Sequence, residues 1–198
     1  MTDMGYSAFK AQNGSHTSGE KALTKDQVKK LLSSITDLEE EALLRLALNA
    51  GIRRNDIVGI KRDGTNTTLR KVGFWESKKK RFKTVDISEE TARVLEMWLN
   101  ATKNIKSDYV FPPRKKGAVH MGDATAYRIL QDNLLKAGLP RRPFHALRST
   151  CIKLCQAQGW EIEKTAKHVG DSVRVIQEHY TTPSEEEMSE AMKNKPNV

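Results

Sequence analysis

Two runs of β-branched and aromatic residues, about 67–75 and 82–87, interrupt a chain whose other apolar residues follow helical spacing. Between the runs lies a basic turn with the sequence ESKKKR, residues 76–81. Two such runs joined by a short polar turn are typical of paired antiparallel strands. This stretch therefore predicts a β-hairpin or small antiparallel sheet with a charged tip, set between helical segments.

The segments on both sides of the predicted sheet have the periodicity of amphipathic helices. Thr24 and Gln27 form a capping-box pattern before the first helix, and Gly51 marks the end of the second. Helices are predicted over 25–35, 38–49, 54–60, 89–103, 123–137, 145–158, 161–168, 172–180 and 184–193. This order predicts an α+β fold that is mainly α, a helical domain with a small antiparallel β-sheet.

The length of 198 residues suits one domain. Residues 1–22 are rich in Gly, Ser, Asn and Thr, lack apolar periodicity and are predicted to be a flexible tail or linker. Residues 23–183 are predicted to form the domain, followed by a polar C-terminal segment, 184–198. Met188 and Met192 are one helical turn apart and form the candidate docking face of that segment, either on a neighbour or on its own subunit.

The charge balance limits the classes of partner. Lys and Arg number 34 and Asp and Glu 25, and the formal net charge of +9 favours a polyanion, mainly nucleic acid. No run reaches the ~18–20 apolar residues of a membrane span, so no membrane partner is expected. Cys151 and Cys155 lie one helical turn apart, where a disulfide would constrain almost nothing, which favours a reduced, cytoplasmic compartment.

His145 and Arg148 are three residues apart in a predicted helix, so both side chains project from one face and can reach one phosphate. The guanidinium is a planar fork of donors for phosphate oxygens, and the imidazole can shuttle a proton. A surface His and Arg near a helix start is the more common explanation of such a pair alone.

Tyr180 and a pair of neighbouring arginines are further candidates. A phenol can attack a phosphodiester and form a phosphotyrosine, although a lone Tyr is usually a half-buried core residue. Arg53 or Arg54 beside Arg148 would place two guanidiniums around one phosphate and stabilise its pentacoordinate transition state. Either arginine can instead be a cation that interacts favourably with the dipole at the C-terminus of the preceding helix.

Two basic segments are candidate DNA contacts. One is the predicted hairpin tip, where a Lys ammonium can protonate a leaving 5′-oxygen, and the other is the loop at 114–117. A solvated run of charge is the usual explanation of such stretches. The predicted DNA-binding residues are Arg54, Lys79, Lys80, Arg81, Arg114, Lys115 and Lys116.

Patterns for other phosphoryl chemistries are missing from the sequence. It has no clustered Asp and Glu for two-metal catalysis, no zinc-spaced Cys and His, and no Gly-rich phosphate loop. Any chemistry on DNA is therefore expected to need no metal, nucleotide or other cofactor.

In their order along the chain, these residues resemble the tyrosine recombinase, or phage integrase, family. Its first Arg stands in a G-[LI]-R-x-x-[ED]-[LI] setting, matched by GIRRNDI at 51–57, which favours Arg53 over Arg54. Its hairpin Lys precedes a K-x-R-x-[VI]-P-[LI] run, matched by SKKKRFKTVDI at 77–87 with Lys78 in the usual place. Lys79 and Lys80 are alternatives for that role.

Later family segments also have counterparts. YVFP at 109–112 and HALRST at 145–150 match the next two, and VGDS at 169–172 aligns with L-G-H-x-S. Asp171 thus stands where the family has a second His, and its spacing to Tyr180 is kept. An Asp there can accept a hydrogen bond or orient a neighbour, but negative charge near the scissile phosphate should cost activity. The resemblance covers roughly residues 24–182.

The resemblance implies that 23–183 is a recombinase catalytic domain acting on double-stranded DNA. Tyr180 would attack the scissile phosphate to give a 3′-phosphotyrosine and a free 5′-hydroxyl. Arg53 and Arg148 would hold the phosphoryl oxygens, His145 would accept the proton, and Lys78 would protonate the leaving oxygen. Asp171 completes the set of candidate catalytic residues.

The resemblance also implies partners. Family members act as tetramers on two duplexes and pass a C-terminal segment to a neighbour, for which 184–198 is the candidate; a monomer or weak dimer is expected without DNA. Because the resemblance implies binding to DNA, the protein is expected to be associated with the nucleoid. The family usually clamps DNA with an additional N-terminal helical domain, which 1–22 cannot form. With Asp171, this motivates the alternative of a catalytically weak or inactive DNA-binding regulator that retains the recombinase fold.

Overall fold

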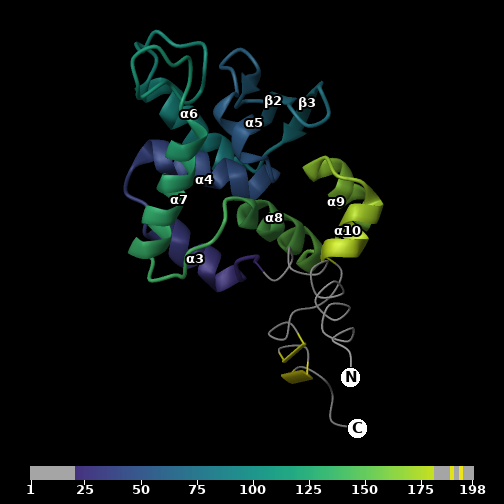
Figure 1. Cartoon of the computed structure of the whole chain (residues 1–198). Helices are drawn as coiled ribbons and strands as arrows, with labels where there is room; N and C mark the ends of the chain where they lie inside the picture. Colours follow the sequence, from purple (N-terminus) through teal and green to yellow (C-terminus); the bar gives the residue numbers. More distant parts are fainter. Residues whose placement is uncertain (1–20, 181–187, 190–191, 194–198) are drawn as a thin grey trace, which may run out of the picture.

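The computed structural model describes residues 21–180, 188–189 and 192–193. Within these ranges the chain forms helices, then a small sheet, then helices again (Figure 1). The elements are α3 Lys25–Ser33, α4 Leu38–Ala50, α5 Arg54–Val58, β1 Thr65–Asn66, β2 Lys71–Glu76, β3 Arg81–Asp86, α6 Glu89–Ala101, α7 Asp123–Lys136, α8 His145–Ala157, α9 Ile162–Val169 and α10 Val173–Tyr180. The predicted mainly helical α+β class is confirmed.

Capping residues set the helix ends that matter for the site. Thr24 and Gln27 form the predicted capping box on α3. α4 ends at Gly51, which has a φ of 61° in the left-handed region. That conformation costs an L-residue roughly 1–2 kcal/mol. Gly51 therefore lets the chain leave α4 sharply and start α5 three residues later, which fixes the position of Arg53 at the N-cap of α5.

The sheet has the order β1-β2-β3, and both strand pairs are antiparallel. β2 and β3 form the predicted hairpin, in register from Lys71 opposite Asp86 to Glu76 opposite Arg81. The prediction of a strand from residue 67 is wrong at its start, because 67–70 are the turn between β1 and β2. β1 has only two residues, too few to leave a periodic pattern in the sequence.

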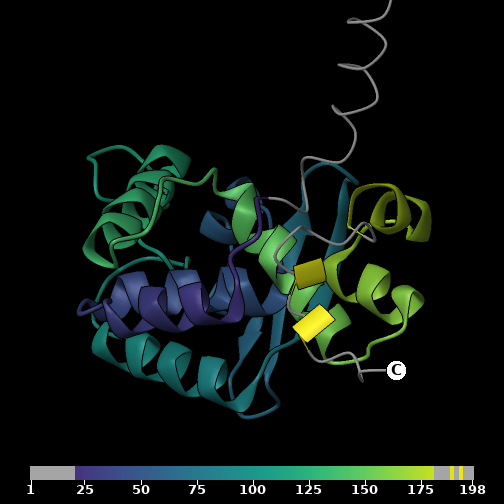
Figure 2. The same cartoon turned by 90° about the horizontal axis from the view of Figure 1, so that it is seen from below.

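The core is built around α4, which packs against α6 on one side and α8 on another. Its Leu43, Leu44 and Leu46 are fully buried. A second, smaller apolar cluster joins α8 to α9 and α10 and includes Ile176 and Tyr180. Figures 1 and 2 show α9 and α10 on one side of α8, with α3, α4 and α7 on the other. α8 therefore runs between the two clusters and can carry side chains to both.

The predicted tail at 1–22 and the predicted helix at 184–193 lie largely outside the described residues. Met188 and Met192 are described and are both more than half exposed; their docking role stays a prediction. Within the described ranges, no helix is long and apolar enough to cross a membrane.

Candidate active site

A cleft of about 490 Å³ brings together side chains from distant parts of the chain. Arg53 enters it from the start of α5, Lys78 from the turn between β2 and β3, and His145 and Arg148 from the first turn of α8. Four of the predicted catalytic residues thus line one cavity, and α8 supplies two of them because residues three apart share a helix face.

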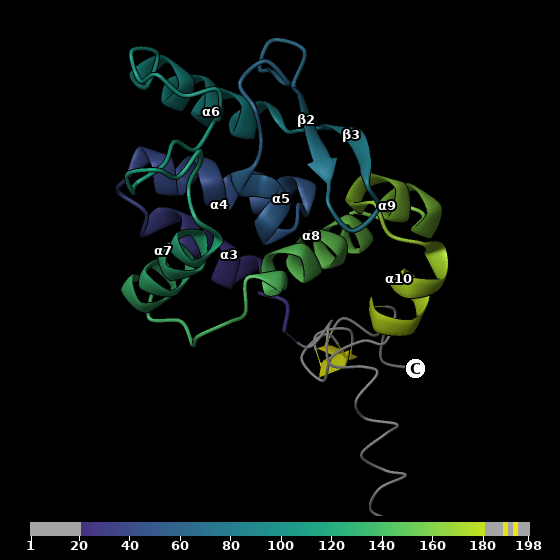
Figure 3. The same ribbon diagram turned by 45° about the horizontal axis from the view of Figure 1, so that its top comes forward.

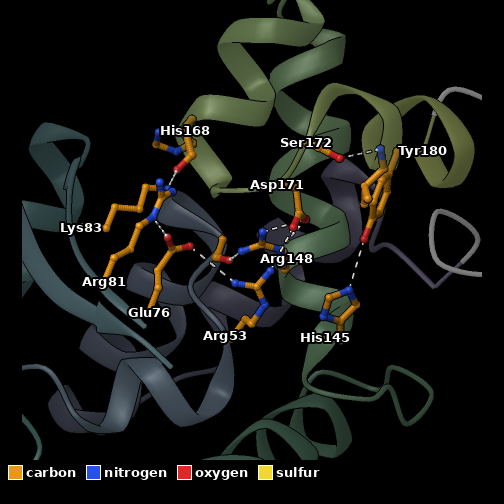
Figure 4. Close-up of polar contacts among 12 residues, drawn as sticks. Arg53, Glu76, Arg81, Lys83, His145, Arg148, His168, Asp171, Ser172 and Tyr180 are labelled. Atoms are coloured by element: carbon orange, nitrogen blue, oxygen red, sulfur yellow. Dashed lines mark hydrogen bonds and ion pairs between the residues drawn. The ribbon is translucent and has the colours of Figure 1, made fainter. Parts of the chain in front are cut away.

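Asp171 lies between the two arginines (Figure 4). Its Oδ1 accepts a hydrogen bond from Arg53 Nη2 at 2.9 Å, and its Oδ2 lies 2.7 Å from Arg148 Nη2. Burial alone would raise the pKa of the Asp171 carboxyl, but Arg148 and Arg53 outweigh burial and hold that pKa below its ordinary value. The carboxylate is therefore ionised and occupies the space where the two guanidiniums converge.

Arg148 is also part of the framework. Its side chain is 2% exposed, and its Nη1 donates a hydrogen bond of 2.6 Å to the carbonyl of Gly51. A buried guanidinium needs both charge compensation and hydrogen-bond acceptors. Asp171 supplies the compensating charge, and the Gly51 carbonyl at the end of α4 supplies an acceptor. Arg148 therefore joins α8, α4 and the segment after α9 in one network.

His145 lines the cleft and contacts Tyr180, which is not among the residues that line it. The Tyr180 hydroxyl lies 3.2 Å from His145 Nε2 (Figure 4), and the Tyr180 side chain is buried in the cluster between α8 and α10. The His145 ring reaches solvent, yet desolvation by the surrounding protein, together with Arg148, lowers its pKa. At neutral pH the ring is therefore mostly neutral, the form that can accept a proton from the phenol.

Lys78 takes its position from a fixed turn. The backbone N–H of Ser77 donates to the buried carboxylate of Asp56 on α5 at 3.1 Å. This bond ties the β2–β3 turn to the helix that begins with Arg53. Lys79 and Lys80 are exposed at the same tip, and Lys80 adopts a positive φ of 49°. Of the three lysines, Lys78 is the one that lines the cleft.

Two charged residues of the hairpin belong to this network although no motif singles them out. Glu76, 1% exposed, lies 3.6 Å from Arg53 and accepts from Arg81 at 2.7 Å. Lys83 donates to the carbonyl of His168 at 2.5 Å, and burial lowers its pKa to about 8 although Glu76 raises it. The alternation of buried residues along β2 and β3 places both on the inner face of the hairpin, which is the sequence signal that could have found them.

Three of the predicted DNA-binding residues are arginines in ion pairs, although their side chains are 38–55% exposed. Arg54 pairs with Asp123 at 2.9 Å, Arg81 with Glu76, and Arg114 with Glu39. The four lysines of the set are exposed: Lys79, Lys80, Lys115 and Lys116. His168, close to Asp171 in sequence, points elsewhere: its Nε2 lies 2.9 Å from the carbonyl of Asn49.

The chain matches the Phage integrase family over residues 21–187. Similar solved structures include XerA recombinase, with a TM-score of 0.77 and 21% identity over 89% of this chain and 66% of that one. XerH site-specific recombinase bound to difH substrate has a TM-score of 0.69 and 17% identity over 88% and 54%. A lambda integrase tetramer bound to a Holliday junction has 0.59 and 16% over 76% and 46%.

The search of curated protein sequences gives no significant match. The chain spans less than two thirds of the length of the solved structures above. At these identities the structural likeness shows the fold alone. The family match is the stronger finding, since it extends over most of the chain: this protein belongs to the phage integrase family, the tyrosine recombinases.

Proposed function

We propose that this chain cuts and rejoins DNA strands through a 3′-phosphotyrosine intermediate on Tyr180. The observation that carries the proposal is the convergence of Arg53, Lys78, His145 and Arg148 on one cleft, with the Tyr180 hydroxyl 3.2 Å from His145. Two guanidiniums, a neutral imidazole and a phenol in one place match the needs of phosphoryl transfer to a tyrosine.

The proposed step balances in atoms and charge. The Tyr180 hydroxyl gives its proton to His145 Nε2 while its oxygen bonds to the scissile phosphorus. The bond from phosphorus to the 5′-oxygen breaks, and Lys78 protonates that oxygen to give a free hydroxyl. The phosphoester is exchanged and not hydrolysed, so a 5′-hydroxyl from another strand can reverse the step.

The two arginines would hold the non-bridging oxygens of the phosphate. Arg148 is oriented by Gly51 and Arg53 by Glu76, so both guanidiniums are positioned before DNA arrives. Asp171 would have to share this space or withdraw as the phosphate enters. We expect the carboxylate to slow cleavage, because it neutralises the groups that stabilise the transition state.

Double-stranded DNA is the proposed partner, held through its phosphates by the exposed lysines and the net charge of +9. XerH was solved on its difH substrate and lambda integrase as a tetramer on a Holliday junction. By analogy we propose a tetramer on DNA, formed by the catalytic domain 23–183 with 184–198 as the exchanged segment, and a nucleoid-associated location.

The test is a suicide substrate, a duplex nicked beside the cleavage point so that the released fragment diffuses away and the covalent adduct accumulates. Wild type should give an adduct that survives SDS, and Tyr180→Phe should give none. Tyr109→Phe is the matched control, because Tyr109 packs against His120 outside the cleft, and it should react as wild type. An adduct with Tyr180→Phe would refute the assignment of the nucleophile.

A second candidate function is a DNA-binding regulator with little or no cleavage activity. The pairing of Asp171 with both arginines favours it, because the charges proposed to act on phosphate are already balanced. Wild type that binds duplex but forms no adduct at any pH or salt concentration would support this function over the enzyme.

A further inference from the structure

The outer face of the β2–β3 hairpin exposes two aromatic side chains at paired positions of the two strands. Trp75 and Phe82 are cross-strand partners, and they are 53% and 63% exposed. Val72, Phe74 and Val85, on the opposite face of the same two strands, are buried. Figure 3 shows the hairpin at the edge of the molecule, beside α9. Large exposed apolar side chains that adjoin one another indicate a binding surface.

The Phe82 ring is held against the strand beside it. A Cβ atom placed on Gly73 would lie 2.5 Å from Phe82 Cζ and 2.9 Å from Cε1. The ring therefore fits where only a glycine leaves room, which limits its rotation. Because most of Phe82 is still exposed, the hairpin presents a preformed aromatic surface. Ordering this surface on binding a ligand would therefore lose little conformational entropy.

The charge around this surface identifies a partner class. Lys78, Lys79 and Lys80 lie at the tip of the same hairpin, and all three are exposed. Exposed aromatic rings on a hairpin with a basic tip suit single-stranded nucleic acid, since phosphates bind the cations and bases of any sequence stack on the rings. A second copy of this chain would bring a tip of the same charge, which disfavours contact between two such hairpins.

We propose that Trp75 and Phe82 form a stacking site for unpaired nucleobases of a DNA strand. The proposal rests on the DNA binding of the proposed function and deepens it. A strand that leaves one partner and joins another must expose unpaired bases beside its free 5′-hydroxyl. The hairpin that carries Lys78, the group placed at that oxygen, carries the aromatic rings as well.

The experiment compares binding of the full chain to two labelled duplexes that differ only in a central block of unpaired thymidines. Wild type should prefer the duplex with unpaired bases. In the double variant Trp75→Thr with Phe82→Thr, affinity for that duplex should fall at least about fivefold, since each stacked base contributes roughly 1–3 kcal/mol. Affinity for the fully paired duplex should not change. Thr keeps the β-propensity of the strands.

Two further variants serve as controls. Leu69→Thr removes an equally exposed apolar side chain from the β1–β2 turn and should leave the preference intact. Trp75→Tyr with Phe82→Tyr keeps an aromatic ring at each position and should retain the preference as well, which separates stacking from folding of the hairpin.

An unchanged preference in the double Thr variant overturns the stacking site and leaves duplex binding standing. If that variant keeps the preference but loses self-association in sedimentation, the surface is a contact between copies and the proposal is wrong. Wild type that binds neither duplex overturns the stacking site and the proposed function together.

Discussion

Replacing Asp171 by Asn should lower stability in the absence of anions, because it removes the counterion of two arginines. Removing one partner of a buried ion pair costs about 3–5 kcal/mol. Arg148 keeps its bond to Gly51, Arg53 keeps Glu76, and the Asp171 side chain is 13% exposed. We therefore expect the lower end, about 3 kcal/mol, which corresponds to a Tm decrease of roughly 6–12 °C for a chain of this size.

Sulfate should reverse this loss if the space between the arginines accepts an oxyanion. A ligand that binds only the folded state at about 100 times its Kd adds about 2.7 kcal/mol, close to the whole deficit. Sulfate should stabilise wild type much less, since the Asp171 carboxylate already fills the space between the two arginines. Asp86→Asn is the matched control: Asp86 pairs with Lys71 on the surface, and the variant should lose less than about 1 kcal/mol.

The effect should depend on pH in a defined direction. The pKa of Asp171 is lowered in the folded state, so its contribution is complete above the unfolded value of about 3.9. The contribution disappears as the pH falls through the lower folded-state pKa. Wild type and Asp171→Asn should therefore differ at neutral pH and converge in acid.

Denaturant unfolding with and without sulfate measures these differences, and the suicide substrate measures activity. If Asp171 competes with the scissile phosphate, Asp171→His should raise the yield of adduct. An Asn variant as stable as wild type in anion-free buffer, or one that sulfate does not rescue, would refute this account of the carboxylate.

Three further predictions concern the surroundings of the site. Gly170→Ala and Gly159→Ala both place a side chain at positive φ, 78° and 75°, and each should lose roughly 1–2 kcal/mol. Gly170→Ala should lose more and also reduce adduct formation, because its Cβ would meet Glu76 and Lys83 whereas the Cβ at Gly159 meets nothing; equal losses in unfolding would contradict this. Lys83 has a folded-state pKa of about 8, below its ordinary value of 10.5, so wild-type stability should rise between pH 8 and 10.5. That rise should be smaller in Lys83→Met. If the stability of the variant and of wild type changes with pH in the same way, burial does not lower the pKa of Lys83. Lys115→Ala should reduce the salt dependence of duplex binding by about one phosphate contact, and an unchanged slope in a titration at several salt concentrations would remove Lys115 from the DNA interface.

Local signals accounted for most of the fold. The capping box at Thr24 and the stop at Gly51 lie within a few residues of the elements they bound, so the sequence indicates them directly. β1 was not predictable in this way, because two residues become a strand only by pairing with β2. Its existence depends on a partner that follows after a turn.

The sequence singles out candidate residues but not the network that joins them. Family motifs single out Arg53, His145 and Arg148, and the structure brings these three side chains to one cleft. The motifs gave no indication that Glu76 would be buried against Arg53, because motifs record positions and not the charges that compensate them. The same limit applies to Asp171: its place in the motif indicated proximity to the site, but only three-dimensional distances reveal that it pairs with both arginines.

The bond from Arg148 to the carbonyl of Gly51 has a practical consequence for anyone who needs an inert version of this protein. That guanidinium also holds α8 against the end of α4. A variant that lacks the Arg148 guanidinium can therefore be inactive either because it does not react or because it does not fold. Trimming a single hydroxyl from Tyr180 leaves the ring and its packing in place. The phenylalanine version is therefore the safer variant for testing the proposed reaction.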